Sequence, residues 1–258
     1  MATVIHPTAI IEDGAQLGTD VTVGAYAYIG ENVKIGDGTV IQHHALVEGN
    51  TTVGKLCEIF SFACIGKKTQ DLKYAGGQTF VEIGDRNVLR EFSTINMGTK
   101  EGEVTRMGND CLLMTYSHVA HGVQVGNNVI ISNCVQIAGE VVIEDFVVMG
   151  GMSGAHQFVR IGKHAMVGGM TAAKQDVAPY MIVDGTFAAE TRGVNLVGLQ
   201  RRGFSKEART QLKEVFRLIY REVLNRSQAI ERIGYEIPDS EEVRYLVDFY
   251  KTSQRGVI

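Results

Sequence analysis

The sequence predicts an all-β main domain, a parallel β-helix built from six-residue repeats, followed by a small α-helical C-terminal domain. Three observations predict this fold. Aliphatic residues recur every six positions over most of the chain, glycine is frequent at 30 of 258 residues, and the C-terminal part loses the repeat and becomes amphipathic. A helix repeats about every 3.6 residues and a plain strand every two, so a six-residue period indicates short strands joined by corners.

The repeat runs in one register from Ile5 to Ile65, resumes at Ile83 and continues to Ala173. Each repeat is expected to turn one aliphatic side chain inward, with a small or β-branched one four positions later. Glycine often follows the aliphatic residue directly, as at Gly36 and Gly54. This fits tight corners, where a positive φ or a close backbone approach penalises a Cβ atom.

Two polar segments interrupt the pattern without shifting its register. They are KKTQDLKYAGGQTF from Lys67 to Phe80 and TKEGEVTR from Thr99 to Arg106. We interpret them as loops extruded from a continuous solenoid, because excursions from a regular scaffold often carry functional residues.

The repeat fades after Pro179, and two amphipathic segments follow. Ser205 precedes KEARTQLKEVFRLIYREVLN and Ser240 precedes EEVRYLVDFYK, each a pattern typical of a capped helix. We expect a β-helix over residues 1–188 and a helical domain over residues 189–258.

Composition excludes several classes of protein. The net charge of −4 offers no basic excess for a phosphate backbone, so nucleic acid is not an expected partner. No segment has the features of a signal peptide or the roughly 18 apolar residues of a membrane span, so we expect a cytoplasmic protein without stable membrane insertion. Its cysteines are expected to be reduced core residues: Cys57, Cys64, Cys111 and Cys134.

The repeat resembles that of the hexapeptide-repeat left-handed β-helix, in which three repeats form one triangular coil of about 18 residues. The resemblance implies the handedness. Residues one coil apart then stack at about 4.8 Å. This places His121, Gly139 and Gln157 on one line, with Gly122 stacked below Glu140. Neither His121 nor Gln157 occupies an inward position, so both are expected to project outward, toward solvent or a neighbouring subunit.

A projecting histidine beside a free glycine N–H suits general-base catalysis with oxyanion stabilisation. His118 and His156 lie near the same line, which leaves two other interpretations open. The histidines are surface residues without a function, or they ligate zinc with an open fourth position, as in carbonic anhydrases built from this repeat.

Several motifs together closely resemble the UDP-N-acetylglucosamine acyltransferase family, whose reaction begins lipid A biosynthesis. The resemblance covers essentially the whole chain, including both loops and the helical tail. Its most specific parts are QDLKYAG (Gln70 to Gly76), SHVAHG (Ser117 to Gly122), IAGE (Ile137 to Glu140), HQF (His156 to Phe158) and RRGFS (Arg201 to Ser205).

The resemblance implies transfer of an (R)-3-hydroxyacyl group from acyl carrier protein to the glucosamine 3-hydroxyl of UDP-N-acetylglucosamine. It implies a homotrimer with active sites between subunits. No cofactor is expected, because a thioester donor needs only a base and oxyanion support. His121 is the implied general base, and the Gly139 N–H is the implied oxyanion donor.

The remaining site residues are also implied by matching motifs. Asp71 and Lys73 are expected to hold the sugar, and His118 and His156 to line the site. Gly169 is expected to leave room for a long acyl chain. The phosphates of the nucleotide or of pantetheine are expected to bind Gln157, Asn195, Arg201 and Arg202.

The sequence departs from the family pattern beside the base. Gly122 stands where many members have an aspartate, and Glu140 where many have a histidine. Because these two positions stack, we hypothesise that Glu140 supplies the carboxylate that orients His121. Asn96 and Met97 replace a usual histidine and arginine.

Three other functions remain open at this point. An acyltransferase with an amine acceptor, either a diamino-sugar nucleotide or another amino sugar, uses similar chemistry, although Lys73 favours the hydroxyl acceptor. A zinc-dependent carbonic anhydrase would use the histidines as ligands. A solenoid used only for binding would use no catalytic base.

Overall fold

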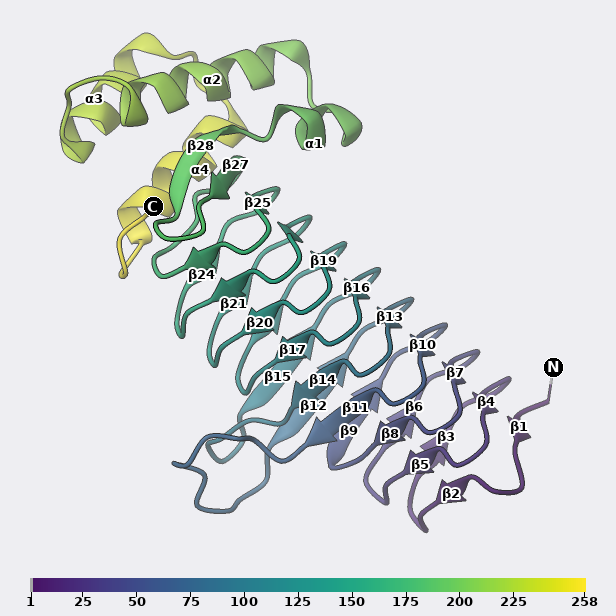
Figure 1. Cartoon of the computed structure of the whole chain (residues 1–258). Coiled ribbons are helices and arrows are strands. Elements are labelled where there is room, and N and C mark those ends of the chain that lie inside the picture. The colour runs from purple at the N-terminus through teal and green to yellow at the C-terminus, as the bar shows by residue number, and fades with distance from the viewer. Residues whose placement is uncertain (1) are drawn as a thin grey trace.

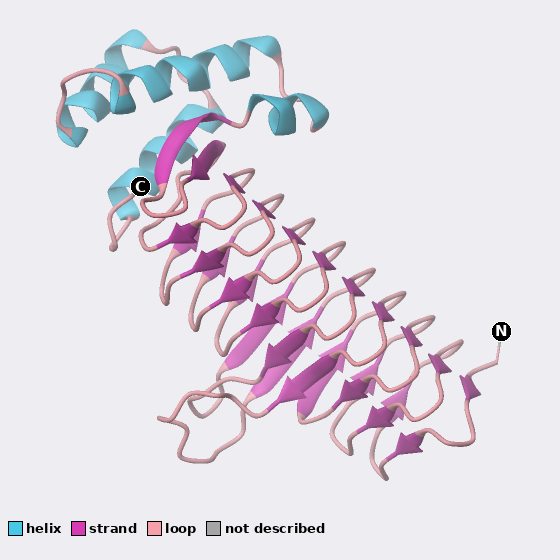
Figure 2. Cartoon of the chain, viewed as in Figure 1, coloured by secondary structure: helices cyan, strands magenta, loops and turns pink. Residues whose placement is uncertain are grey.

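The computed structural model describes residues 2–258, most of which form a three-sided prism capped by helices (Figures 1 and 2). From β1 to β26, consecutive strands enter sheets A, B and C in turn, and the last two strands both join sheet A. Sheet A contains β1 (Val4–Ile5), β4 (Thr22–Val23), β7 (Val40–Ile41), β10 (Glu58–Ile59), β13 (Val88–Leu89), β16 (Leu112–Leu113), β19 (Ile130–Ile131), β22 (Val148–Met149), β25 (Met166–Val167), β27 (Met181–Asp184) and β28 (Glu190–Val194).

The other two sheets form the remaining sides of the prism. Sheet B contains β2 (Ile10–Ile11), β5 (Tyr28–Ile29), β8 (Leu46–Val47), β11 (Cys64–Lys67), β14 (Thr94–Asn96), β17 (His118–Val119), β20 (Gln136–Ile137), β23 (Gly154–Ala155) and β26 (Ala172–Ala173). Sheet C contains β3 (Gln16–Leu17), β6 (Lys34–Ile35), β9 (Asn50–Val53), β12 (Phe80–Ile83), β15 (Val104–Met107), β18 (Gln124–Val125), β21 (Val142–Ile143) and β24 (Arg160–Ile161).

Strand pairing confirms the stacking expected from the repeat. In sheet B, His118 pairs with Gln136 and Ile137 pairs with Ala155, all in parallel register. From β4 to β26 the aliphatic residue of each strand is buried, which gives the prism one continuous core, whereas in the first coil Ile5 is exposed and Ile11 and Leu17 are partly buried. The six-residue period therefore sets which residues of successive coils lie on one another.

Close approach, and not positive φ, explains most glycines that follow the aliphatic residues; Gly66, with a φ of +80°, is an exception. A Cβ atom on Gly36 would lie 2.6 Å from the carbonyl carbon of Gly54, closer than any real contact. Positive φ instead occurs two residues after such glycines, at residues that include Tyr26, Leu56 and His164. The coils stack too closely for a side chain at the glycine position.

The two extruded loops exist with different bounds from those predicted. The first spans residues 68–79. The second spans residues 97–103, because β14 ends at Asn96 and because Phe80 pairs with Val104, which starts β12 and β15 earlier than expected. Both loops project from the same side of the prism (Figure 1).

The C-terminal part packs on the end of the prism. It contains α1 (Leu196–Arg201), α2 (Lys206–Tyr220), α3 (Arg226–Glu236) and α4 (Glu241–Thr252). The predicted caps are confirmed: Ser205 accepts a hydrogen bond from Ala208 N and Ser240 accepts one from Val243 N. The predicted first helix is wrong beyond Tyr220, because Asn225 begins the separate helix α3 with its own capping box.

The predicted boundary between residues 188 and 189 falls inside a β-hairpin, since β27 pairs antiparallel with β28. The second hydrophobic core already includes Ala178, Tyr180 and Met181. Within residues 2–258, no helix combines the length and the apolar character needed to cross a bilayer.

Candidate active site

The candidate base lies at the corner where β17 of sheet B turns toward β18 of sheet C. His121 stacks beneath Gly139, as the repeat predicts: a Cβ atom added to Gly139 would lie 2.2 Å from His121 Nε2. The Glu140 N–H donates to the His121 carbonyl at 2.9 Å, which fixes the two coils against each other. Only glycine at position 139 leaves room for this ring.

The Gly139 N–H is available to a ligand. Its neighbours Ala138 and Glu140 both donate to adjacent coils, and Gly139 donates to no acceptor within residues 2–258. A free backbone donor beside an imidazole is the arrangement that stabilises a developing oxyanion.

His121 projects from its coil as expected, but it is covered and not exposed to solvent. Its exposed fraction is 8% because both extruded loops close over it. Asp71 Oδ2 of the first loop lies 3.5 Å from Nε2, and Glu103 Oε2 of the second loop lies 3.7 Å from Nδ1. The repeat predicts that His121 projects from its coil, but not that the loops cover it, since a loop's path is not periodic.

Glu140 has a different partner from the one hypothesised. Its carboxylate forms an ion pair with Lys100 of the second loop, with 2.8 Å between Oε1 and Nζ. Burial acts to raise the pKa of Glu140, but hydrogen bonds with Lys100 and Glu103, together with the charges of Lys100 and His121, lower that pKa overall. The carboxylate within ion-pairing distance of Nδ1 is that of Glu103, a residue that the repeat gives no reason to select.

A groove of about 760 Å³ opens beside His121 on the outer face of sheet B. Its floor consists of small or uncharged residues, among them Ala138, Gly154 and Ala172, and its rim includes Asp71 and Lys73 from the first loop. His118, His156 and Gln157 also line it, so the structure brings these predicted site residues together.

The histidines around this groove have separate partners. His118 Nδ1 lies 2.7 Å from Thr94 Oγ1, and burial lowers the pKa of its imidazole. His156 Nδ1 lies 3.3 Å from the Arg255 guanidinium. Asn96, another groove residue, holds the start of the first loop through its Nδ2, which donates to the Lys67 and Lys68 carbonyls. This explains an amide at a position where the resemblance leads one to expect histidine.

The other predicted residues lie away from His121 within one chain. Gly169 is exposed at the corner between β25 and β26, against the carbonyl of Gly151. Asn195 caps α1 by accepting from Gly198 N and is buried. Arg201 ends α1, and Arg202 stacks over the Phe146 ring at 4.7 Å.

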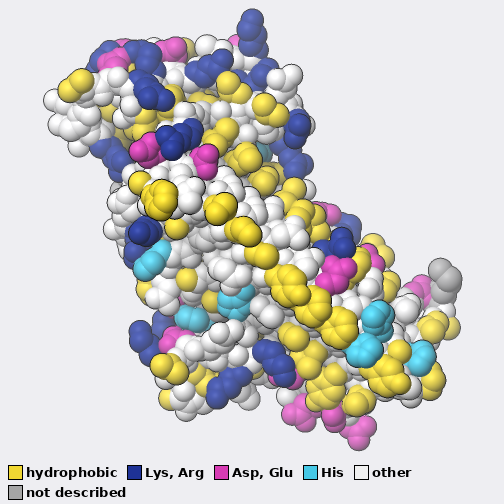
Figure 3. All heavy atoms as spheres, viewed as in Figure 1, with side chains coloured by type: hydrophobic (Ala, Val, Ile, Leu, Met, Phe, Trp, Pro, Cys, Tyr) yellow, Lys and Arg dark blue, Asp and Glu magenta, His cyan; other side chains and the backbone are white. Residues whose placement is uncertain are grey.

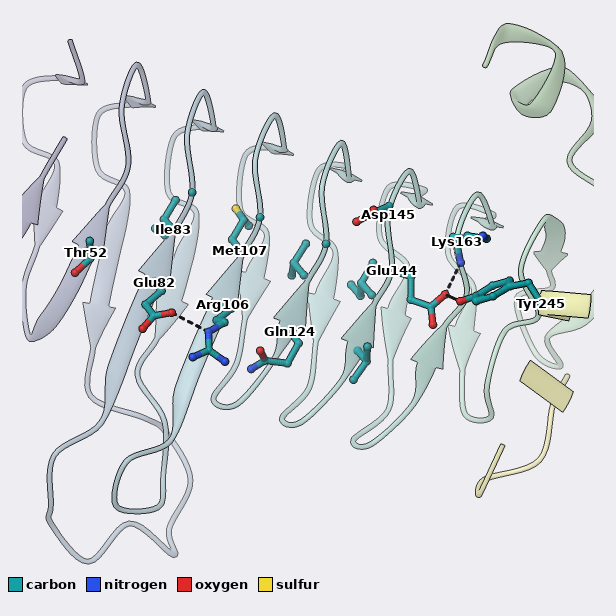
Figure 4. A pocket seen from close by; sticks show the side chains of 16 residues that line it. Thr52, Glu82, Ile83, Arg106, Met107, Gln124, Glu144, Asp145, Lys163 and Tyr245 are labelled. Atoms are coloured by element: carbon teal, nitrogen blue, oxygen red, sulfur yellow. Dashed lines mark hydrogen bonds and ion pairs between the residues drawn. The ribbon is translucent and has the colours of Figure 1, made fainter. Parts of the chain in front are cut away.

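A second groove, of about 730 Å³, lies on the outer face of sheet C (Figure 4). Its charged groups have partners within the protein. Glu82 Oε2 lies 2.8 Å from Arg106 Nε, and Tyr245 of α4 donates to Glu144. Burial, together with the Glu144 carboxylate, raises the pKa of the Tyr245 hydroxyl.

Comparison with known proteins gives consistent matches. Residues 176–258 match the model of the UDP-N-acetylglucosamine O-acyltransferase domain 2 family, and residues 2–36 and 105–139 match bacterial transferase hexapeptide repeats. LpxA from Acinetobacter baumannii is 40% identical over 99% of both chains, with a TM-score of 0.94. LpxA from Bacteroides fragilis, a UDP-N-acetylglucosamine acyltransferase, is 38% identical over 99% of this chain and 100% of that one, with a TM-score of 0.96. The β-helix is left-handed, as in these relatives.

Proposed function

The chain belongs to the UDP-N-acetylglucosamine acyltransferase family, and from this premise we propose that it transfers an (R)-3-hydroxyacyl group from acyl carrier protein to the glucosamine 3-hydroxyl of UDP-N-acetylglucosamine, a step of lipid A biosynthesis. The observation that carries the proposal is the His121 imidazole held against Gly139, whose N–H is free. A base and an oxyanion donor at one point are what thioester acyl transfer requires.

In this reaction, Nε2 of His121 accepts the proton of the sugar hydroxyl as its oxygen attacks the thioester carbonyl carbon. The carbonyl oxygen becomes negatively charged and is stabilised by the Gly139 N–H. The C–S bond then breaks, the ester remains on the sugar, and the imidazolium returns its proton to the leaving thiolate. No cofactor takes part in these steps.

Asp71 and Lys73 are suited to hold the sugar. Asp71 Oδ2 lies 3.5 Å from Nε2, so a hydroxyl between the two would contact both acceptors. The turn of the first loop is held by Asp71 Oδ1, which accepts from Lys73 N at 3.0 Å. His118, His156 and Gln157 line the same groove and complete the walls of the site.

The acyl chain is assigned to the groove on sheet B. Its floor beside His121 and Gly139 includes residues of β20, β23 and β26, and we assign the far end of the chain to the corner before β26, which carries Gly169. Glycine at position 169 leaves this end open, which supports a long acyl chain.

Assembly as a homotrimer is supported by an exposed apolar line along the corner between sheets A and B (Figure 3). Phe62 stacks on Phe92 at 5.1 Å between ring centroids, and Phe92 on Tyr116 at 4.9 Å. The line continues with exposed Met152 and Met170. A continuous apolar surface of this kind marks a protein contact, here with further copies of the chain.

Trimer formation also gives a role to residues far from His121. Asn195, Arg201 and Arg202 belong to α1 and its flanks, at the end of the prism. We assign them to the nucleotide or pantetheine phosphates bound at a neighbouring subunit's His121, and Asn195 acts by capping α1.

Product mass is the test of this function. Purified protein is incubated with UDP-N-acetylglucosamine and 3-hydroxyacyl carrier proteins of increasing chain length, with the coenzyme A thioesters in parallel. We expect a mono-acylated sugar nucleotide from the carrier-protein donors, and an alkali-labile ester confirms the hydroxyl acceptor. Acylation only of an amino-sugar nucleotide would contradict the proposal. Light scattering of the same preparation should give the mass of three chains, and Phe92→Asp should lower it.

A further inference from the structure

The imidazole of His121 has one nitrogen without a partner. Nδ1 is buried and, among residues 2–258, makes no hydrogen bond. The groups that face the ring are Asp71 from the first loop, Glu103 and Lys100 from the second, and Glu140 from the next coil. Of these, the Glu103 carboxylate is at Nδ1, with Oε2 at 3.7 Å.

Glu103 occupies the space that a side chain at position 122 would need. Gly122 has a φ of +66°, and a Cβ atom added there would lie 2.9 Å from Glu103 Oε1. The carboxyl carbon of Glu140 would be 3.2 Å away on the other side. The chain thus lacks a side chain directly after His121, and a carboxylate from the second loop fills the gap.

The second loop holds this carboxylate in place. The Thr99 N–H donates to Glu103 Oε2, and the Lys100 N–H lies 3.4 Å from the same oxygen. Thr99 Oγ1 in turn lies 3.1 Å from Thr69 Oγ1, which ties the second loop to the first. Glu140 is paired with Lys100 and also interacts with Glu103 and His121, but of the two carboxylates Glu103 is the one that lies within 4 Å of Nδ1.

We propose that Glu103 is the positioning residue for His121: its carboxylate accepts from Nδ1–H, which leaves Nε2 free as the base, and stabilises the imidazolium formed during acyl transfer. The inference rests on the proposed function. The 3.7 Å separation is consistent with this role, because catalytic hydrogen bonds often tighten only when substrate is bound. A carboxylate on the far nitrogen fixes the tautomer and orientation of a histidine base.

Glu103, His121 and Glu140 also offer three ligand atoms within 4.8 Å of one another. A metal ion there would have to displace the Lys100 ammonium from Glu140 and would occupy the nitrogen that orients the base. The ion pair already present favours a site that works without metal.

The test compares Glu103→Gln with Glu140→Gln and with Glu101→Gln, a matched change in the same loop. The amide keeps the size of Glu103 and its ability to accept from Thr99. We expect kcat to fall about 10- to 100-fold in Glu103→Gln, with little change in KM. The acidic limb of the pH profile of kcat/KM should move to lower pH, because loss of the nearby anion disfavours the imidazolium. Glu101→Gln should behave as wild type.

A second experiment moves the carboxylate from position 103 to position 122. Glu103→Ala clears the space beside Gly122, and aspartate tolerates positive φ better than most residues. The double variant Glu103→Ala with Gly122→Asp should therefore recover at least part of the activity that Glu103→Ala alone loses. A merely structural role for Glu103 would not be rescued in this way.

Three outcomes would overturn the inference: an unchanged pH profile in Glu103→Gln, a larger loss in Glu140→Gln than in Glu103→Gln, or loss of wild-type activity on treatment with EDTA and its return with zinc. The activity of the wild-type enzyme distinguishes failure of the proposed function from failure of the role of Glu103. If it forms no acylated sugar nucleotide, the proposed function fails, whereas product formation that is insensitive to Glu103 refutes only the role of this residue.

Discussion

The outer faces of sheets B and C carry grooves of similar volume, about 760 and 730 Å³. They differ in whether their polar groups have partners within the protein. On sheet C, the charges are satisfied within the protein: Glu82 pairs with Arg106, and Glu144 accepts from Tyr245 (Figure 4). On sheet B, Gly139 N–H and His121 Nδ1 remain without partners among residues 2–258.

The difference originates in the loops. Unpaired polar groups are costly when buried, so a fold retains them where a ligand will satisfy them. Both extruded loops close over the corner beside sheet B and bring carboxylates to His121, whereas α4 covers the end of the sheet C groove with a paired tyrosine. Groove size alone does not identify the site.

The largest expected effect comes from removing the base. His121→Ala should lower the acylation rate by about 10²- to 10⁴-fold, since no other imidazole lies beneath Gly139. Glu82→Gln in the sheet C groove is the control and should stay close to the wild-type rate, because exposed ion pairs contribute little. Single-turnover acylation rates of the two variants check this. Equal losses of rate would mean that the sheet B groove is not the specific site of catalysis.

Two glycine substitutions should separate catalysis from stability. Gly139→Ala pushes a methyl group into the movable His121 ring, so we expect about a 10²- to 10³-fold loss of kcat with little change in Tm. Gly126→Ala in the sheet C groove meets Asp145 N at 2.9 Å and the Glu144 carbonyl carbon at 3.0 Å, so it should lower Tm instead. Melting curves and acylation rates of both variants test these two expectations. A large fall in Tm for Gly139→Ala would mean that Gly139 is needed for stability and not specifically for catalysis.

A larger side chain at position 169 should close the far end of the acyl groove and shorten it. Gly169→Met places a flexible side chain at the corner of β25 and β26, where a Cβ atom meets only the Gly151 carbonyl, at 3.3 Å. We expect the preferred acyl chain to become shorter, measured as relative kcat/KM across a donor series. Val142→Met on the face of sheet C should leave the preference unchanged, and a similar shift in both variants would place the chain elsewhere.

The smallest effect concerns a histidine at the third corner, between sheets C and A. Burial, aided by Lys163 and Arg202, lowers the pKa of His164 to about 4. The unfolded chain binds this proton near its ordinary pKa of about 6.5, so stability falls as the pH drops from there toward 4. His164→Phe, which can stack on Phe146 in the same way, should reduce the fall in Tm over this window. An unchanged pH dependence would mean that other groups, such as His118, dominate it.

The coils and the alignment of His121 with Gly139 could be predicted because the repeat is strictly periodic. Each coil consumes a fixed number of residues, so a position in the sequence determines its neighbours in adjacent coils. The helix caps could be predicted for a different reason, because Ser205 and Ser240 act through hydrogen bonds to residues three positions later. The short helix α1 and the separate helix α3 carried weaker local signals and were not predicted.

The burial of His121 and the carboxylate at its Nδ1 were decided by tertiary structure alone. Gly122 and Glu140 stack as the repeat predicts, and this suggested Glu140 as the partner, yet Lys100 pairs with Glu140 and Glu103 turns toward the ring. The sequence by itself determined the coil, its core and the line that carries the base. It did not determine the paths of the two loops, because an aperiodic segment takes its conformation from contacts with distant residues, such as Thr69 with Thr99.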